Sequence, residues 1–144
     1  LRLYKHGNIE AFNTLKAHMN VHYDRYRYDT RQKSEQDRIA IERITADSAE
    51  PKSIADFRAF GANMRGALKG SGSRDAGFKW LQGLDAIIID PARCPHAADE
   101  FTLYEYEIDR KSGDVMTGYP KGQPDHCMDA VRYAMESVYR HGGS

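Results

Sequence analysis

The stretch IERITADSAEPKSIADF, residues 41–57, decides the expected fold of this chain. Apolar and polar side chains alternate over residues 41–47, which predicts a short strand that ends on the carboxylate of Asp47. Pro51 then follows a serine and a glutamate, a pattern typical of a helix start, and Ile54 begins an apolar stripe at helical spacing. The stretch therefore predicts a strand that leads directly into a helix.

A second strand and a second helix are predicted downstream of this unit. The glycine-rich residues 66–73 form a connection, and Ser73 is expected to cap the helix that follows. The apolar run AIIID, residues 86–90, predicts a strand buried on both faces. A crossover that contains a helix separates this run from residues 41–47, so the two strands are expected to pair in parallel.

The remaining patterns are weaker, but they predict both ends of the domain. Alternation over residues 104–109 and a turn at residues 111–114 predict a hairpin, which follows a short helix at residues 97–103. Pro124 opens a final amphipathic helix that is expected to extend to about Arg140. The N-terminal patterns predict, in order, a strand at residues 1–4, a helix at 11–19, a strand at 21–28 and a helix or loop at 34–41.

Chain length indicates one domain over residues 1–144, the predicted strands and helices make it α/β, and composition excludes several classes of protein. The chain has 40% hydrophobic and 29% charged residues, and it has no apolar run long enough to cross a membrane. Its 21 basic residues balance its 21 acidic ones, so any binding of a polyanion must be local. Two cysteines far apart favour a reducing, intracellular setting. Because the chain opens on Leu1 inside a strand-like pattern, we expect it to be a fragment.

Three side chains are candidates for metal chemistry. Asp47 stands at the end of a predicted strand, and His126 and Asp129 lie three residues apart on the first turn of the last helix. Carboxylate oxygens can hold Mg²⁺ or Mn²⁺, the ions that assist phosphodiester hydrolysis. The alternative is structural, because such aspartates also cap helices or complement the helix dipole, and a histidine is more often simply packed or exposed.

A basic stretch surrounds the glycine-rich connection. Arg65, Lys69 and Arg74 occur there without an acidic residue before Asp75. These side chains could contact nucleic-acid phosphates, although a solvated charged face is the default interpretation. The spacing of glycines matches neither a P-loop nor a dinucleotide fingerprint.

Four stretches in register carry a resemblance to a known family. They are TADSAEPKSI (residues 45–54), ALKGSGS (67–73), IIIDPARCPHAADEFTLYEYEID (87–109) and DHCMDAVRYAMESVYR (125–140). Together they resemble the C-terminal nuclease domain of the large terminase subunit of tailed double-stranded DNA phages. The resemblance covers roughly residues 41–140, whereas residues 1–40 match poorly.

The resemblance implies a ribonuclease H-like fold, with a mixed central β-sheet flanked by helices. It also implies an endonuclease that uses two divalent ions, Mg²⁺ or Mn²⁺, to cut concatemeric DNA during genome packaging. Double-stranded DNA is the expected substrate, and the small terminase subunit and the portal protein are expected partners. The expected location is the cytoplasm of the infected or lysogenic bacterial host, with no membrane association.

Site residues follow from the same resemblance. Asp47 matches the family's second metal-binding aspartate, and Asp129 matches the C-terminal one. His126 matches a histidine that part of the family has beside this C-terminal aspartate. His126 would act as a metal ligand or a proton-transfer group. Lys69 would lie near the DNA backbone. Arg65 and Arg74 are the other expected DNA contacts, and they come from the basic stretch described above and not from the resemblance.

One expected carboxylate is missing. The family's first catalytic aspartate precedes the ADSAEPKSI stretch in a D-x-G-like context, and HYDRYRYDT, residues 22–30, does not match that context. Either the first strand lies before Leu1, or this segment has diverged, and both would weaken metal binding and cleavage. A Walker A sequence is also absent, so the packaging ATPase is not in this chain.

Two other functions therefore remain open. The domain could be a docking module for nucleic acid or for the portal or another partner, with the same fold and no catalysis. It could also be an unrelated α/β domain. DNA affinity that is indifferent to Mn²⁺ would favour docking, and a lack of DNA binding would favour the unrelated domain.

Overall fold

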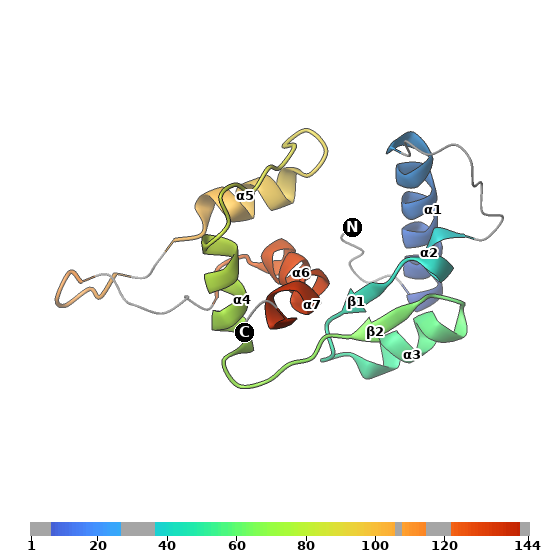
Figure 1. Ribbon diagram of the computed structural model, residues 1–144, viewed down its shortest axis with the longest axis horizontal. Coiled ribbons are helices and arrows are strands. Elements are labelled where there is room, and N and C mark those ends of the chain that lie inside the picture. The colour runs from blue at the N-terminus through green and yellow to red at the C-terminus, as the bar shows by residue number, and fades with distance from the viewer. Residues whose placement is uncertain (1–6, 27–36, 106–107, 115–121, 142–144) are drawn as a thin grey trace. The chain divides into compact units, whose positions relative to one another are not determined.

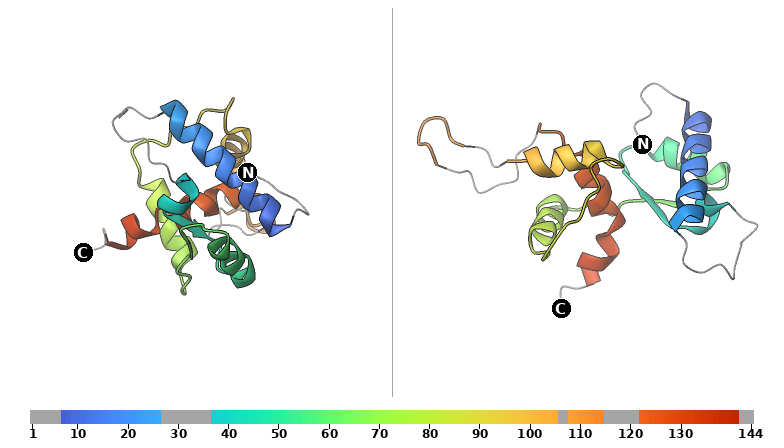
Figure 2. Two further views of the ribbon diagram at one scale, coloured as in Figure 1. Left: turned by 90° about the vertical axis from the view of Figure 1, so that its right-hand side faces the viewer. Right: turned by 90° about the horizontal axis from the view of Figure 1, so that it is seen from above.

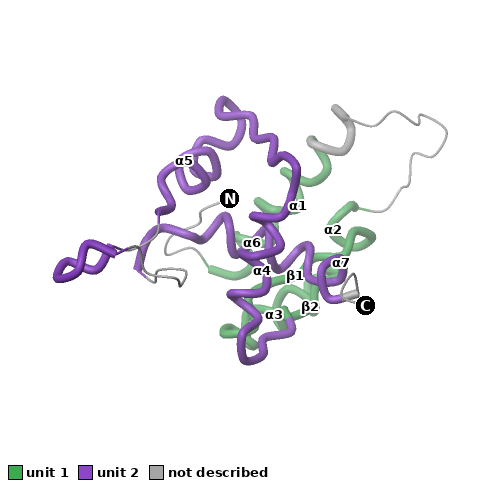
Figure 3. The backbone as a smooth tube through the Cα atoms, turned by 60° about the vertical axis from the view of Figure 1, so that its left-hand side comes forward, with its two compact units in different colours: residues 1–67 green, residues 68–144 purple. Residues whose placement is uncertain are grey.

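The computed structural model describes residues 7–26, 37–105, 108–114 and 122–141. Its chain divides into two compact units, residues 1–67 and residues 68–144 (Figure 3). Each unit is described by itself below. That residues 1–144 form a single domain stays a prediction, and the strand predicted at residues 1–4 lies outside the described residues.

A parallel strand–helix–strand unit forms the centre of the first unit. Strand β1 (Ile44–Ala46) leads into helix α3 (Pro51–Ala59), which returns to strand β2 (Met64–Gly66) (Figure 1). The strands pair in parallel, with Ile44 opposite Met64 and Ala46 opposite Gly66. The helix predicted from residues 41–57 is thus confirmed, and the strand predicted over residues 41–47 is confirmed over residues 44–46, since Ile41 ends a short helix. The parallel partner of β1 is β2, however, and not residues 86–90.

Local chemistry fixes both ends of α3. Pro51 lies in the first turn, where its fixed φ suits a helix and its missing N–H costs nothing. Gly61 follows the end of the helix with a φ of 107°, a backbone angle that residues with a Cβ rarely adopt. Arg58 Nε then donates to the Met64 carbonyl at 2.7 Å, which ties the end of the helix to β2.

Two further helices complete the first unit. Helix α1 (Asn8–Tyr26) packs against α2 (Arg38–Ile41) and against α3. Phe12, Ile39 and Ala62 are buried at the centre of the core. The rings of Phe12 and Phe57 meet edge to face, with centroids 5.9 Å apart.

Helix α1 confirms one N-terminal prediction and corrects another. The helix expected at residues 11–19 is present. The strand expected at residues 21–28 is wrong over residues 21–26, because α1 continues to Tyr26, and residues 27–28 lie outside the described residues. A short alternation of tyrosines is a weak strand signal, because β-propensity depends strongly on context.

The second unit is helical over its described residues. It contains α4 (Ser73–Gln82), α5 (Pro95–Leu103), α6 (His126–Ala134) and α7 (Glu136–His141). Helix α6 packs against the other three helices, and its contact with α5 can be followed in Figure 2. Phe78, Leu81 and Met128 are buried at the centre of the core, with Phe78 stacked on Tyr104.

The strand predicted at residues 86–90 is wrong. This segment has no regular secondary structure, and the side chains of Ile87 and Ile88 are 43% and 95% exposed. A strand requires a hydrogen-bonded neighbour, and the described part of the chain provides none here. An apolar run indicates a tendency toward burial, but it does not show which neighbour is available.

Three other boundaries differ from the sequence prediction. Gly72, and not Ser73, is the N-cap of α4. The predicted final helix is interrupted at Met135, which separates α6 from α7. The turn predicted at residues 111–114 is present, since Gly113 N donates to the Asp109 carbonyl. Of the strand predicted at residues 104–109, the described residues contain a single bridge residue, Ile108, and the chain that would pair with it after the turn lies outside the described residues. Of the helices described, none is both long and apolar enough to span a membrane.

Candidate functional site

Asp47 lies directly after β1, in the first unit. Its side chain is exposed, and its Oδ1 accepts the backbone N–H of Ala49 at 2.8 Å. This short turn leads the chain from the strand toward α3. Asp47 therefore stands at the carboxyl end of a parallel strand, where open α/β sheets place their ligand sites.

His126 and Asp129 lie on the first turn of α6, in the second unit. Asp125 precedes the helix as its N-cap residue, so the helix begins two residues after Pro124, the start that the sequence predicted. His126 is exposed, and the side chain of Asp129 is 26% exposed. The i, i+3 spacing places these two side chains on one face of the helix.

Arg132 holds Asp129 through one carboxylate oxygen. Its Nε and Nη2 donate to Asp129 Oδ1 at 3.1 and 2.8 Å, while Asp129 Oδ2 accepts no hydrogen bond from the described residues. The Arg132 side chain is only 5% exposed. Burial disfavours its charge, but the hydrogen bonds to Asp129 outweigh burial, and the pKa of Arg132 lies above its ordinary value.

A buried carboxylate on α5 supports the start of α6. Glu100 is 5% exposed, and its Oε2 accepts the backbone N–H groups of Cys127 and Met128 at 2.5 and 3.3 Å. These are N–H groups that a helix leaves without an internal partner, and a negative charge there also complements the helix dipole. Glu100 thus fixes the turn that carries His126.

Replacing Glu100 with Gln is expected to lower the free energy of unfolding by about 1–2 kcal/mol, because neutral acceptors bind N–H groups less strongly than a carboxylate does. Urea unfolding followed by circular dichroism measures the change. The exposed Asp99 on the same helix supplies the control, since Asp99→Asn should change stability by less than about 0.5 kcal/mol. Equal stability of the Glu100→Gln variant and the wild type would contradict this role.

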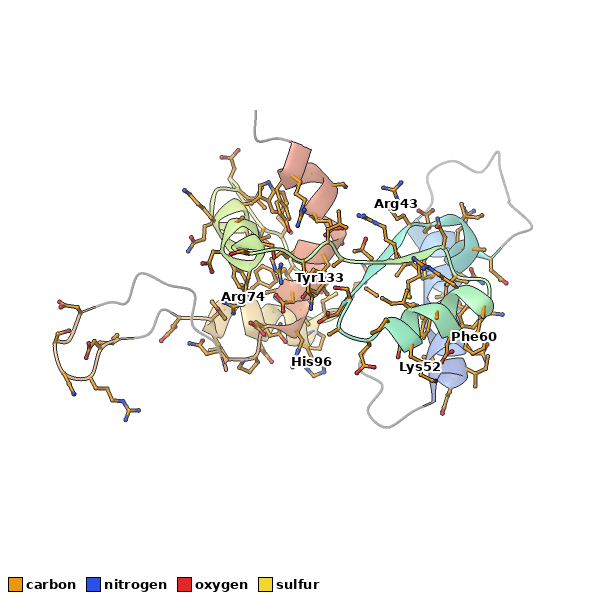
Figure 4. All side chains as sticks on the ribbon, turned by 90° about the horizontal axis from the view of Figure 1, so that it is seen from below. Arg43, Lys52, Phe60, Arg74, His96 and Tyr133 are labelled. Carbon is orange, nitrogen blue, oxygen red and sulfur yellow. The ribbon has the colours of Figure 1, made fainter. Side chains whose placement is uncertain are left out.

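The three basic candidates lie in different surroundings. Arg65 is half-buried in β2 of the first unit. Lys69 is exposed in the second unit, and its Nζ lies 5.6 Å from the centre of the Tyr133 ring. Arg74, on α4, is labelled with Tyr133 in Figure 4. Their contact with DNA stays a prediction.

Arg74 makes several contacts within the second unit. Its Nη2 donates to Asp125 Oδ2 at 2.7 Å and to the Tyr104 hydroxyl at 3.1 Å, and its guanidinium lies over the Phe78 ring. Burial lowers the pKa of Arg74, but the hydrogen bonds outweigh it, so the pKa lies above its ordinary value. Burial also raises the pKa of Tyr104. This arginine stabilises the start of α6.

The segment that carries Lys69 is attached to α7. Glu136, which is 2% exposed, accepts the backbone N–H of Leu68 at 3.0 Å. Arg140 Nη2 donates to the carbonyl of the same Leu68. Both backbone groups of Leu68, its N–H and its carbonyl, are therefore bound by side chains of α7.

Sequence reasoning missed the roles of Glu100 and Glu136. Each is an acidic residue within a helical stretch, and such residues are usually exposed. Their partners are backbone groups 27 and 68 positions away along the chain, so no local pattern indicates them.

The candidate ligands occur in two units, with Asp47 in the first and His126 and Asp129 in the second. Within the described residues of either unit, no three His, Cys, Asp or Glu side chains form a group that could hold a metal ion. The donor types nevertheless suit a hard divalent ion, since Asp47 and Asp129 offer carboxylate oxygens and His126 an imidazole. Asp129 fits this use best, because Arg132 binds its Oδ1 while its Oδ2 accepts no hydrogen bond from the described residues.

A family model described as the terminase RNase H-like domain matches residues 10–137. The chain belongs to this terminase family. The ribonuclease H-like fold expected from the sequence is thus confirmed, and within the described residues its sheet is the parallel pair of β1 and β2.

Two relatives agree with this assignment of the terminase domain. This chain is 44% identical to the terminase large subunit of Bacillus phage SPP1 over 103 residues. The matched region covers 70% of this chain and 24% of that protein. The chain thus spans about a quarter of the length of this curated relative. It is also similar to the solved nuclease domain of the SPP1 large terminase with bound Mn, with a TM-score of 0.70 and 32% identity over 95% of this chain and 67% of that one.

Proposed function

We propose that this terminase domain is a divalent-metal-dependent endonuclease that hydrolyses phosphodiester bonds of double-stranded DNA during phage genome packaging. The observation that carries the proposal is the likeness to the Mn-bound nuclease domain of phage SPP1. The matching order of ADSAEPKSI and the H-x-x-D turn of α6 supports it. The proposed location is the cytoplasm of the bacterial host, with the small terminase subunit and the portal protein as partners.

The proposed ligands are Asp47, His126 and Asp129, and the complete site would take two Mg²⁺ or Mn²⁺ ions. When bound, such ions supply charge neutralisation at the phosphate and an activated water. Asp129 offers its Oδ2 while Arg132 holds its Oδ1. His126, exposed on the same turn, can bind an ion or move a proton at a ring nitrogen.

Lys69 is the proposed contact to the DNA backbone. It is exposed, and the attachment of Leu68 to α7 restricts where its backbone can lie. An ammonium group supplies attraction to phosphate without base specificity. Arg65 and Arg74 are proposed to contribute positive charge to the same substrate, although the guanidinium of Arg74 also pairs with Asp125.

A plasmid assay tests this function. Supercoiled DNA is incubated with the purified chain in Mn²⁺, in Mg²⁺ and in EDTA. We expect nicking in metal only, and a loss of at least about 100-fold in Asp47→Asn, because an amide cannot replace a carboxylate as an anionic ligand. Asp56→Asn is the matched control in the same unit, since Asp56 pairs with Asn8 and Lys52, and it should cut at the wild-type rate.

The alternative is a docking domain without catalysis. Its support is the missing first aspartate of the family, since HYDRYRYDT, residues 22–30, does not match the expected D-x-G-like context. The docking function would be supported, and the nuclease overturned, by a folded wild type that cleaves DNA with neither Mn²⁺ nor Mg²⁺ but still binds it. Its DNA affinity should then fall with rising salt and be the same with and without Mn²⁺. Equal cutting by wild type and Asp47→Asn would overturn the role of Asp47.

A further inference from the structure

The arginine that holds Asp129 is itself enclosed by its neighbours. The Arg132 side chain is 5% exposed, and its guanidinium lies 4.5 Å from the centre of the Tyr133 ring and 6.0 Å from that of Phe78. Ion pairs at i, i+3 on a helix are usually exposed and contribute little. This pair differs because aromatic rings limit where the guanidinium can move.

A glycine on α4 makes room for the arginine. A Cβ added to Gly77 would lie 2.1 Å from Arg132 Cδ and 2.3 Å from Arg132 Cγ, which is far inside van der Waals contact. Gly77 is itself buried within a helix, where glycine is unfavourable relative to alanine by about 1 kcal/mol. Glycine at position 77 therefore has a packing reason, because the Arg132 side chain occupies the space that a Cβ would take.

The hydrogen bonds of Arg132 define the orientation of the carboxylate. Both donors go to Oδ1 of Asp129, so rotation of the carboxylate would break two hydrogen bonds at once. Oδ2 accepts none from the described residues, and the aspartate side chain keeps 26% of its surface exposed. One oxygen is thus bound by Arg132, while the other accepts no hydrogen bond from the described residues.

We propose that Arg132, placed in the gap above Gly77, is a positioning residue that orients Asp129 for a divalent cation. The inference rests on the proposed function, because it assigns Asp129 as a ligand. Outer hydrogen-bond partners of metal ligands fix ligand orientation, and their loss typically weakens metal affinity by about 10–100-fold. Arg132 does not touch the ion or the substrate in this proposal.

The test measures Mn²⁺ binding and not cleavage. The full chain is titrated with Mn²⁺, and the free ion is followed by electron paramagnetic resonance. Arg132→Lys keeps the positive charge but loses the two-donor fork, so we expect its affinity for Mn²⁺ to fall by about 10-fold or more. Arg140→Lys is the control, because Arg140 also donates a hydrogen bond within the second unit, to the Leu68 carbonyl, and is not among the proposed ligands or DNA contacts. Its Mn²⁺ affinity should stay within about twofold of the wild type.

Asp129→Asn separates failure of the inference from failure of the proposed function. If wild type binds Mn²⁺ and Asp129→Asn does not, the ligand assignment stands. Unchanged affinity in Arg132→Lys would then overturn the positioning role alone. Equal losses in Arg132→Lys and Arg140→Lys would also overturn it, since they would indicate general loosening of the unit. Binding that is absent in wild type, or unchanged in Asp129→Asn, overturns both.

Discussion

Asp129→Ala is expected to lower the free energy of unfolding by about 3 kcal/mol, because it leaves the guanidinium of Arg132 buried without its carboxylate. The Arg132 side chain is 5% exposed, so water cannot easily replace the lost partner. Asp129→Asn keeps an oxygen that can accept from the fork, and its cost should be nearer 1 kcal/mol. Both variants are expected to lose metal-dependent cleavage.

Urea unfolding of the two variants checks this difference, with Asp99→Asn as an exposed aspartate control in the same unit. The comparison also decides how cleavage data should be interpreted. An alanine at position 129 removes the proposed ligand and destabilises the unit together, whereas asparagine removes mainly the charge. Equal destabilisation by the two substitutions would contradict the hydrogen bonds between Arg132 and Asp129.

Gly77→Ala is expected to destabilise the second unit by about 2 kcal/mol, although alanine is the better helix former. The new methyl would meet Cγ and Cδ of Arg132, which lie in the middle of a buried side chain and cannot simply swing into solvent. Overpacking should therefore outweigh the gain in helix propensity. The same displacement would release Asp129 from its hydrogen bonds.

A double-mutant cycle makes this prediction specific. In the background of Arg132→Ala, the space beside position 77 is empty, so Gly77→Ala should stabilise the unit by up to about 1 kcal/mol. The sign of the change thus reverses with the residue at position 132. Unfolding in urea provides all four free energies, and an equal cost in both backgrounds would refute a direct contact between these two positions.

Local patterns were sufficient for the elements that have strong boundary signals. Pro51 and Gly61 bound α3, and the alternation before Asp47 indicated β1. Residues 86–90 show where this reasoning stops. Their apolar run is genuine, but strand formation depends on a partner that lies elsewhere in the chain. The interruption at Met135 also had no signal, because neither proline nor glycine occurs there.

The sequence singled out candidate ligands but not the residues that support them. Asp47 was singled out by its place at a strand end, and His126 and Asp129 by their spacing, and that assignment remains a proposal. The contact between Gly77 and Arg132 joins two helices, so it could not be deduced from either stretch. Glu100 was missed for the same reason, because its partners are backbone N–H groups of another helix.

The attachment of Leu68 to Glu136 and Arg140 has a consequence for the order of folding. Its hydrogen bonds join residues 68 and 72 positions apart. During synthesis α7 must therefore leave the ribosome before Leu68, at the start of the second unit, can form these hydrogen bonds. Until then the strand–helix–strand unit ahead of residue 68 can already form from local contacts, whereas the glycine-rich connection waits for the far end of the unit. Lys69, next to Leu68, therefore takes its final position only after α6, the helix that carries Asp129, has been synthesised.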